Sequence, residues 1–274
     1  EPATAIDHED ARANRDDAGD EPEARPAAAR SRRSSRGRPP RVLIDTDALR
    51  WRWYRTPAKR HTSVARDFKE IKRPLLARAW GRGSERVPNG QRIMVTSALP
   101  REGKTFCAIN LALSIAAERD RGVILIDADL ARPSVPRELG IEGGMGLVDW
   151  LLDEDVDVDR VVRRTNIKRL QLLTAGHRHH RATELLTSDA MDRLLHRLDA
   201  LYPDTIFVFD SSPLLATSES AALADHVGQV VMVVASGETT RASVSEALGK
   251  LPESLAIGTI LNKVPRSRSS GYET

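Results

Sequence analysis

The sequence predicts a doubly wound α/β domain built around a mostly parallel sheet. Between residues 91 and 264, short apolar runs suited to buried strands alternate with helical patterns. Three of the runs end in side chains suited to binding a phosphate or a metal ion. The carboxyl ends of parallel strands meet at one edge of a sheet, where ligands bind in such folds. The expected strands lie near residues 92–97, 123–127, 169–174, 205–210, 229–234 and 256–262.

Residues 1–41 are expected to be disordered. They are rich in alanine, proline and charged residues and contain almost no large apolar side chains, so they cannot bury enough surface to offset the entropy of ordering. The segment is acidic at first and becomes basic from Arg25 onward. The basic block suits an anionic partner, such as a membrane surface or an acidic tail, and equally a solvated tether.

The composition of the whole chain indicates a cytoplasmic protein. Its single cysteine, Cys107, rules out an internal disulfide and favours a reducing compartment. The apolar runs are too short and too interrupted by charge to cross a membrane. No secretory signal is apparent, because the N-terminal residues are acidic and polar.

Residues 42–90 are predicted to be a linker that contains one helix. Apolar residues recur at near-helical spacing from about Ser63 to Trp80, and Pro74 is expected to interrupt this helix. Basic side chains flank the apolar stripe. We therefore expect the helix to dock on the main domain or on a neighbouring subunit.

A phosphate-binding loop is predicted after the first strand. The run RIMVTS leads into ALPREGKT, which ends in Gly103, Lys104 and Thr105 where a helical pattern starts. In such loops backbone N–H groups point at the phosphates, the lysine reaches the outer phosphates, and the hydroxyl binds Mg²⁺. The match is incomplete, because Ala98 stands where the first glycine is expected. The loop taken alone is also compatible with an ordinary strand–turn–helix.

Three aspartates follow two of the later strands. Asp127 and Asp129 lie on one side of the segment VILIDAD, and Asp210 ends the run TIFVFD. An acid at the carboxyl end of a parallel strand is well placed to coordinate Mg²⁺ beside a phosphate. Each aspartate alone is also common as a helix cap or turn former. That second interpretation does not explain all three acids together with the loop.

The motifs together resemble the bacterial tyrosine kinases of exopolysaccharide and capsule systems, which are built on a P-loop ATPase of the ParA/MinD type. The resemblance covers about residues 60–264 and is closest to the autokinases of exosortase-associated polysaccharide loci. The segments that carry it include MVTSALPREGKTFCAINLALSIA, VILIDADLARPS, FVFDSSPLLATSE and ILNKV.

The resemblance implies an ATP- and Mg²⁺-dependent tyrosine autokinase domain over residues 91–264. The implied catalytic residues are Lys104, Asp127, Asp129 and Asp210, with Asp127 as the candidate base. The implied Mg²⁺ ligands are Thr105, Asp127, Asp129 and Asp210. The implied nucleotide-binding residues are Ala98, Pro100, Arg101, Glu102, Gly103, Lys104, Thr105, Phe106 and Asn262, the last of them against adenine. The implied phosphoacceptor is Tyr272, in a flexible tail of residues 265–274.

The resemblance also implies partners. A membrane-embedded chain-length or export protein would activate the kinase and hold it at the inner face of the plasma membrane. A homo-oligomer is expected, and a cognate tyrosine phosphatase would be a further partner. Nucleic acid is not expected, because the basic segment has arginines but no recognisable reading motif.

The chain departs from the family pattern at three places. Arg101 replaces a glycine of the P-G-E-G-K loop, at a cost of about 1 kcal/mol or more if the position needs a positive φ. Ser212 replaces the first proline of D-S-P-P. The family's acid followed by two basic residues, in the helix expected to contact other subunits, is here Arg66, Lys69 and Lys72. The acid is missing, which leaves ring assembly through this motif in question.

Two other functions stay open. A ParA/MinD-like switch ATPase would hydrolyse ATP without modifying tyrosine. Such ATPases carry a lysine early in the loop, and Leu99 at that position favours the kinase. A degenerate nucleotide-binding scaffold is compatible with Arg101 and with the single tyrosine of the tail.

Overall fold

The computed structural model of the chain describes residues 41–51, 54, 63–81 and 83–265, all of which belong to one compact unit. Most of the segment predicted to be disordered therefore lies outside the described residues. Tyr272 and nearly all of the predicted tail lie outside them as well. Arg41, which was assigned to the disordered segment, instead begins a short strand.

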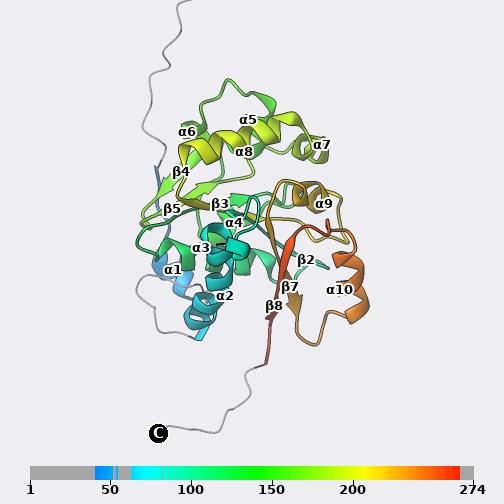
Figure 1. Ribbon diagram of the computed structural model, residues 1–274. Helices are drawn as coiled ribbons and strands as arrows, with labels where there is room; N and C mark the ends of the chain where they lie inside the picture. Colours follow the sequence, from blue (N-terminus) through cyan, green and yellow to red (C-terminus); the bar gives the residue numbers. More distant parts are fainter. Residues whose placement is uncertain (1–40, 52–53, 55–62, 82, 266–274) are drawn as a thin grey trace, which may run out of the picture. The chain divides into compact units, whose positions relative to one another are not determined.

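The centre of the fold is a mostly parallel sheet, as the sequence predicts (Figure 1). In the described part of the chain it has eight strands in the order β1-β4-β5-β3-β6-β2-β7-β8. The pair β4–β5 is antiparallel and the other neighbouring pairs are parallel. The strands are β1 Arg41–Val42, β2 Arg92–Ser97, β3 Gly122–Asp127, β4 Val162–Thr165, β5 Leu170–Leu173, β6 Thr205–Asp210, β7 Gln229–Ala235 and β8 Ala256–Asn262.

All six predicted strands are confirmed, and the sequence missed β1 and β4. The central strands are buried on both faces, so they appear in the sequence as continuous apolar runs. In contrast, β4 has the sequence VRRT and β1 has two residues. Neither carries a recognisable strand pattern, and both form only because β5 and then β4 supply a sheet edge.

Helices cover both faces of the sheet. Buried residues of α1 to α4 pack with Ile93 and Val95 of β2, whereas those of α5 to α9 pack with Met94 on the opposite face. This is the alternation expected of a strand between two layers. The helices are α1 Thr46–Trp51, α2 Ser63–Trp80, α3 Lys104–Ala116, α4 Val135–Leu139, α5 Leu147–Leu152, α6 Val158–Val161, α7 Ala182–Leu186, α8 Asp189–Leu201, α9 Glu219–Ala224 and α10 Arg241–Leu248, with a 3₁₀ turn at Gly83–Glu85.

The helix predicted in the linker forms over the expected range and packs on α3. Phe68, Leu75 and Ala79 of α2 are buried against the core that α3 shares with the sheet. The expectation that Pro74 interrupts this helix was wrong, because α2 is continuous from Ser63 to Trp80. Pro74 is exposed, so the backbone bond that it cannot donate is lost at the solvent side while burial of the opposite stripe holds the helix.

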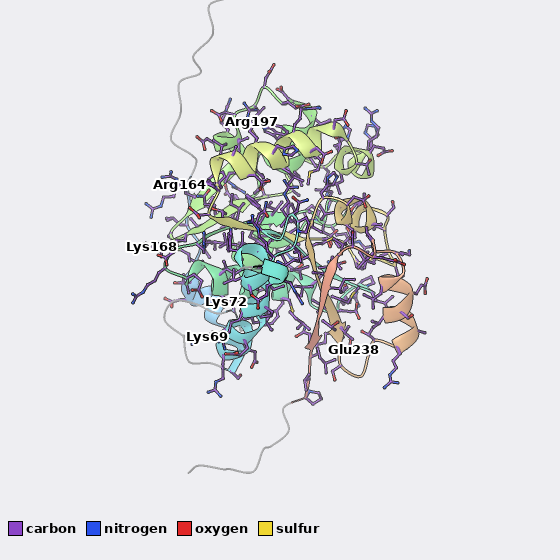
Figure 2. The ribbon with its side chains drawn as sticks, in the orientation of Figure 1. Lys69, Lys72, Arg164, Lys168, Arg197 and Glu238 are labelled. Carbon is purple, nitrogen blue, oxygen red and sulfur yellow. The ribbon has the colours of Figure 1, made fainter. Side chains whose placement is uncertain are left out.

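Lys72 of α2 is buried and stabilises the end of α3. Its Nζ donates a hydrogen bond to the carbonyl of Ser114 at 2.7 Å and forms an ion pair with Glu118. The last four carbonyls of a helix lack partners within the helix, and a cation there also complements the helix dipole. Lys69, on the same helix, is exposed (Figure 2). Thus Lys72, predicted as part of a subunit-contact motif, forms its described contacts within its own subunit.

None of the helices in the described part of the chain combines the length and apolarity that a membrane crossing would need.

Candidate active site

The loop between β2 and α3 forms a compact turn whose last residue requires glycine. Gly103 has φ 97°, and a Cβ built there would lie 2.1 Å from Nδ2 of Asn262. The helix begins at the next residue, Lys104. Its first N–H groups therefore face the loop, and the positive end of the helix dipole adds to their attraction for an anion.

Two side chains brace the loop. Glu102 is buried, and its carboxylate accepts the N–H of Leu99 at 2.6 Å and a hydrogen bond from Thr239. Asn262, at the end of β8, donates from Nδ2 to the carbonyl of Glu102 at 2.8 Å. Asn262 was predicted to contact adenine, and its described hydrogen bond is to the loop. The other predicted loop positions divide between Ala98, which is buried, and Pro100, which is exposed.

Arg101 has the positive φ that would be unfavourable for a residue other than glycine. Its φ is 69°, in the left-handed region, where an L-residue costs roughly 1–2 kcal/mol. The same is true of three other non-glycine residues in the described part of the chain: Asn89, Arg169 and Lys263. A glycine at this position would be free of that cost.

The lysine of the loop points at one of the predicted aspartates. Nζ of Lys104 lies 2.9 Å from Oδ2 of Asp129. The other oxygen of Asp129 accepts from the backbone of Arg132 and from the hydroxyl of Ser212, each at 3.1 Å. That hydroxyl also lies 2.9 Å from the buried carboxylate of Glu219. Ser212 therefore links two buried acids, a connection that a proline could not make.

Asp127 and Asp210 lie opposite each other on adjacent strands, β3 and β6. Oδ2 of Asp127 accepts the N–H groups of Ser134 and Val135 at the start of α4, at 3.1 and 3.0 Å. The helix-cap interpretation is thus correct for one oxygen of Asp127. Its Oδ1 is buried without a hydrogen-bond partner. Both oxygens of Asp210 are buried as well, beside the hydroxyl of Thr105, which lowers the pKa of this carboxyl group.

Both acids are shifted toward the protonated form. Burial, and then the charge of Asp210, raises the pKa of Asp127 well above its usual range, against the hydrogen bonds of Val135 and Ser134. Burial likewise raises the pKa of Asp210 to about 7, although the charge of Lys104 and the hydroxyl of Thr105 oppose the shift. A bound cation would favour the ionised form of both carboxyl groups.

The donor set fits Mg²⁺. Three buried carboxylate oxygens of Asp127 and Asp210, on adjacent strands, are suitable ligands. Thr105 at the start of α3 supplies a hydroxyl, which lies 3.0 Å from the hydroxyl of Ser134. In the described residues, no three acid, histidine or cysteine side chains already surround one point. Mg²⁺ does not need such a cage, because it usually keeps waters and binds one or two carboxylates plus substrate phosphates.

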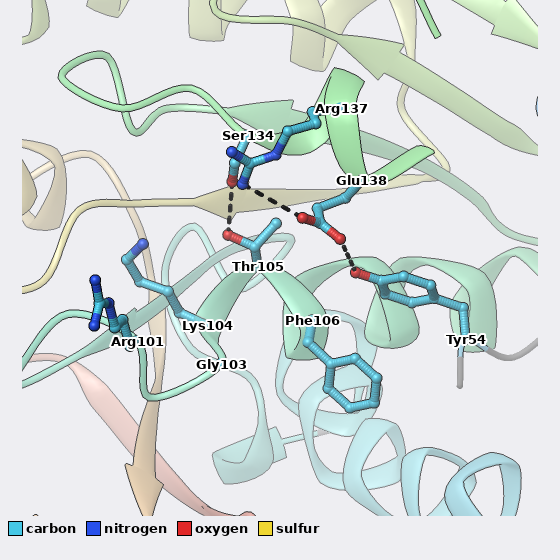
Figure 3. Close-up of a pocket in the computed structure, with 9 residues that line it drawn as sticks. All are labelled: Tyr54, Arg101, Gly103, Lys104, Thr105, Phe106, Ser134, Arg137 and Glu138. Carbon is cyan, nitrogen blue, oxygen red and sulfur yellow. Dashed lines mark hydrogen bonds and ion pairs between the residues drawn. The ribbon is translucent and has the colours of Figure 1, made fainter. Parts of the chain in front are cut away.

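A pocket of about 570 Å³ opens beside the loop (Figure 3). Phe106 of α3 forms one wall and stacks on Tyr54, with ring centroids 5.3 Å apart. The hydroxyl of Tyr54 donates to Glu138 of α4 at 3.1 Å. Phe106 was predicted from the sequence, whereas Tyr54, Arg137 and Glu138 were missed, since no local motif marks them. The residues that line the pocket are Tyr54, Arg101, Gly103, Lys104, Thr105, Phe106, Ser134, Arg137 and Glu138.

Comparison with known proteins decides the family. No protein-family model matches the chain. Tyrosine-protein kinase YwqD of Bacillus subtilis is 35% identical over 183 residues, which make up 66% of this chain and 75% of YwqD. The chain belongs to the bacterial tyrosine-protein kinases. Two further relatives are similar to this chain. Tyrosine-protein kinase Etk of Escherichia coli is 30% identical to it over 182 residues. The succinoglycan biosynthesis transport protein ExoP of Rhizobium meliloti is 32% identical to it over 187 residues. The match covers 66% of this chain in both cases, but about a quarter of each relative, 24% of Etk and 23% of ExoP.

Solved structures agree with this assignment. The VpsO kinase domain superposes with a TM-score of 0.61 at 31% identity, covering 72% of this chain and 95% of that one. The kinase domain of Escherichia coli Etk gives 0.59 at 31% identity, covering 66% and 70%. MinD of Pyrococcus horikoshii, solved with Mg-ADP, gives 0.51 at 22% identity over 65% of this chain and 72% of MinD, which shows the fold alone. The predicted resemblance and the P-loop fold class are both confirmed.

Proposed function

We propose that this kinase transfers the terminal phosphoryl group of ATP to a tyrosine of its own chain or of another copy, as part of exopolysaccharide synthesis or export. The observation that carries the proposal is the convergence of Lys104, Asp127 and Asp210 at the carboxyl ends of the strands, with buried carboxylate oxygens beside the phosphate loop. The names of the relatives YwqD, Etk and ExoP support both the reaction and its setting.

Each residue has a role in this proposal. The N–H groups of the loop and Lys104 bind the phosphates, while Thr105 and Asp210 would hold Mg²⁺, which would supply positive charge to the phosphate groups. Asp129 orients Lys104 through their 2.9 Å ion pair. Asp127 accepts the proton of the incoming phenol as the bond from oxygen to phosphorus forms and the bond to the departing ADP breaks.

The acceptor in the proposal is Tyr272. The chain has three tyrosines, and the other two are engaged inside the fold. Tyr54 is 5% exposed and donates to Glu138. Tyr202 is half-buried beside Asp159, and burial raises the pKa of its phenol to about 12. Both hydroxyls would have to leave their partners before reacting.

A membrane-embedded export or chain-length protein is the proposed activator, and it would hold the kinase at the inner face of the plasma membrane. Self-association is also proposed, because transfer to Tyr272 of another copy requires two copies to meet. We also propose the domain boundaries predicted from the sequence, with the kinase domain at residues 91–264, and a tyrosine phosphatase as a further partner. The name of ExoP, a biosynthesis transport protein, supports the link to polysaccharide export.

The test is incubation of the purified chain with ATP and Mg²⁺, followed by mass spectrometry of all tyrosine-containing peptides. Phosphate should appear on Tyr272 and fall by at least about 100-fold in Lys104→Met and Asp127→Asn. Lys168→Met is the matched control, because this exposed lysine precedes β5 and so lies at the amino ends of the parallel strands, away from the candidate site. ATP hydrolysis with every tyrosine unmodified, even with the activator's cytoplasmic segment added, would instead establish a switch ATPase. No turnover and no phosphate transfer would establish a scaffold.

A further inference from the structure

Arg101 is an unusual residue for the position that it occupies. It lies in the phosphate loop with φ 69°, a backbone conformation that favours glycine. Strained backbone of this kind persists where the surrounding structure enforces it, and such residues cluster at functional sites. The backbone conformation alone does not assign a role to Arg101, but the position of its side chain in the pocket does.

The side chain of Arg101 lines the pocket together with Lys104 and Thr105. In Figure 3 the side chains of Arg101 and Lys104 extend from the loop in the same direction. Two cations that face one pocket repel each other, and each is attracted to an anion that lies between them. The arrangement therefore favours a multiply charged anion at this end of the pocket.

Neighbouring acids do not neutralise Arg101. Lys104 is paired with Asp129, whereas the guanidinium of Arg101 forms no ion pair with any residue that the structure describes. The adjacent acid, Glu102, is 3% exposed and turned inward to Leu99 and Thr239. The loop thus presents an exposed guanidinium to the pocket while its own carboxylate is used to hold the loop closed.

We propose that the Arg101 side chain binds the terminal phosphoryl group of a nucleoside triphosphate and neutralises charge on it during transfer, a role supplied within the same chain. This inference rests on the proposed phosphoryl transfer. During transfer the bond from the terminal phosphorus to the bridging oxygen breaks and the bond to the acceptor oxygen forms. The positive guanidinium of Arg101 stabilises the negative charge on the transferred group and on the departing ADP. A planar guanidinium can contact two phosphate oxygens at once, which a single ammonium group cannot do with the same geometry.

The test compares Arg101→Gly with Arg169→Gly. Arg169 has φ 67°, almost the same as Arg101, but it precedes β5 at the opposite edge of the sheet. Both substitutions relieve the same backbone strain, so both variants should melt at an equal or higher temperature than the parent without nucleotide. Folding is therefore not the explanation for any loss that Arg101→Gly shows.

Binding is measured by calorimetry with Mg²⁺ and either ADP or an ATP analogue that has a non-hydrolysable β–γ linkage. Arg101→Gly should weaken the analogue about tenfold and leave ADP within twofold. It should also slow tyrosine phosphorylation by about 10–1,000-fold, and Arg101→Lys should recover part of that loss. Arg169→Gly should match the parent in each measurement.

The inference is overturned if Arg101→Gly binds the ATP analogue as tightly as the parent, or phosphorylates tyrosine as fast or faster. Its failure can be told apart from failure of the proposed function. A parent protein that phosphorylates tyrosine and is unaffected by Arg101→Gly refutes the inference alone. A parent that discriminates the ATP analogue from ADP through Arg101, yet modifies no tyrosine, refutes the kinase proposal and upholds only the binding of the terminal phosphoryl group by Arg101.

Discussion

Replacing Lys72 by methionine should lower the free energy of unfolding by about 2–3 kcal/mol. The substitution keeps the length of the side chain and its apolar packing between α2 and α3, and it removes the ammonium group. What is lost is the 2.7 Å hydrogen bond to the Ser114 carbonyl and the ion pair with Glu118. A hydrogen bond from a charged donor contributes about 1.5–3 kcal/mol. Glu118 is 40% exposed, so its pair adds less than about 1 kcal/mol.

The assay is urea denaturation at pH 7, followed by circular dichroism, with thermal melting as a second readout. For a domain of this size each 1 kcal/mol lowers the Tm by roughly 2–4 °C, so Lys72→Met should melt about 4–12 °C below the parent. Lys69→Met is the control, since it makes the same chemical change at an exposed position of the same helix. It should stay within about 0.5 kcal/mol of the parent.

Equal stability of the two variants would refute the assignment of Lys72 to the end of α3. Self-association gives an independent check. If Lys72 instead served a contact between copies, Lys72→Met would change the sedimentation behaviour, and its effect on the Tm would depend on protein concentration. A loss of stability that is independent of concentration supports the contact within one subunit.

Three further outcomes are expected. Cys107 is buried in α3, and burial raises its pKa to about 12. At pH 8.5 iodoacetamide should therefore modify it only on unfolding, and rapid alkylation of the native protein would contradict this. The stability that the neutral thiol provides should decrease as the pH rises from about 9 toward 12. Pro74→Ala should raise the unfolding free energy by about 1–3 kcal/mol in urea denaturation, because an exposed proline inside α2 costs helix stability, and an unchanged midpoint would show that the helix is already interrupted. Ser212→Ala should cost about 1–3 kcal/mol in the same assay, because the buried acids Asp129 and Glu219 lose a shared donor, and a neutral result would show that their contacts with Ser212 are not hydrogen bonds.

Much of the sheet could be predicted because its strands carry their own signal. A parallel strand that is covered on both faces is apolar through its middle, and β2, β3, β6 and β7 each have such a central apolar run. The loop and the acids were found for the same reason, since they follow such strands at the edge where ligands bind. By contrast, β4 and β1 depend on pairing with an existing edge, which no local pattern reveals.

The sequence by itself determined the order of the central strands along the chain, the position of the phosphate loop, and the identity of Lys104, Asp127 and Asp210 as the polar groups at its side. These are local properties: composition, spacing and a turn. Only the tertiary structure decided how these groups are paired. It set Asp129 against Lys104, which is 25 residues away, and Lys72 against Ser114, which is 42 residues away.

The direction of the loop's side chains was likewise a tertiary decision. From the sequence, a positive φ at Arg101 was one of two alternatives, and the folded loop has this conformation. Glu102 points inward to Thr239, which is 137 residues away, and Arg101 faces the pocket. Tyr54 reached that pocket in the same way, through Phe106 and Glu138. Such contacts join segments that are far apart in the chain, and their free energy depends on packing and desolvation that exist only once the core has formed.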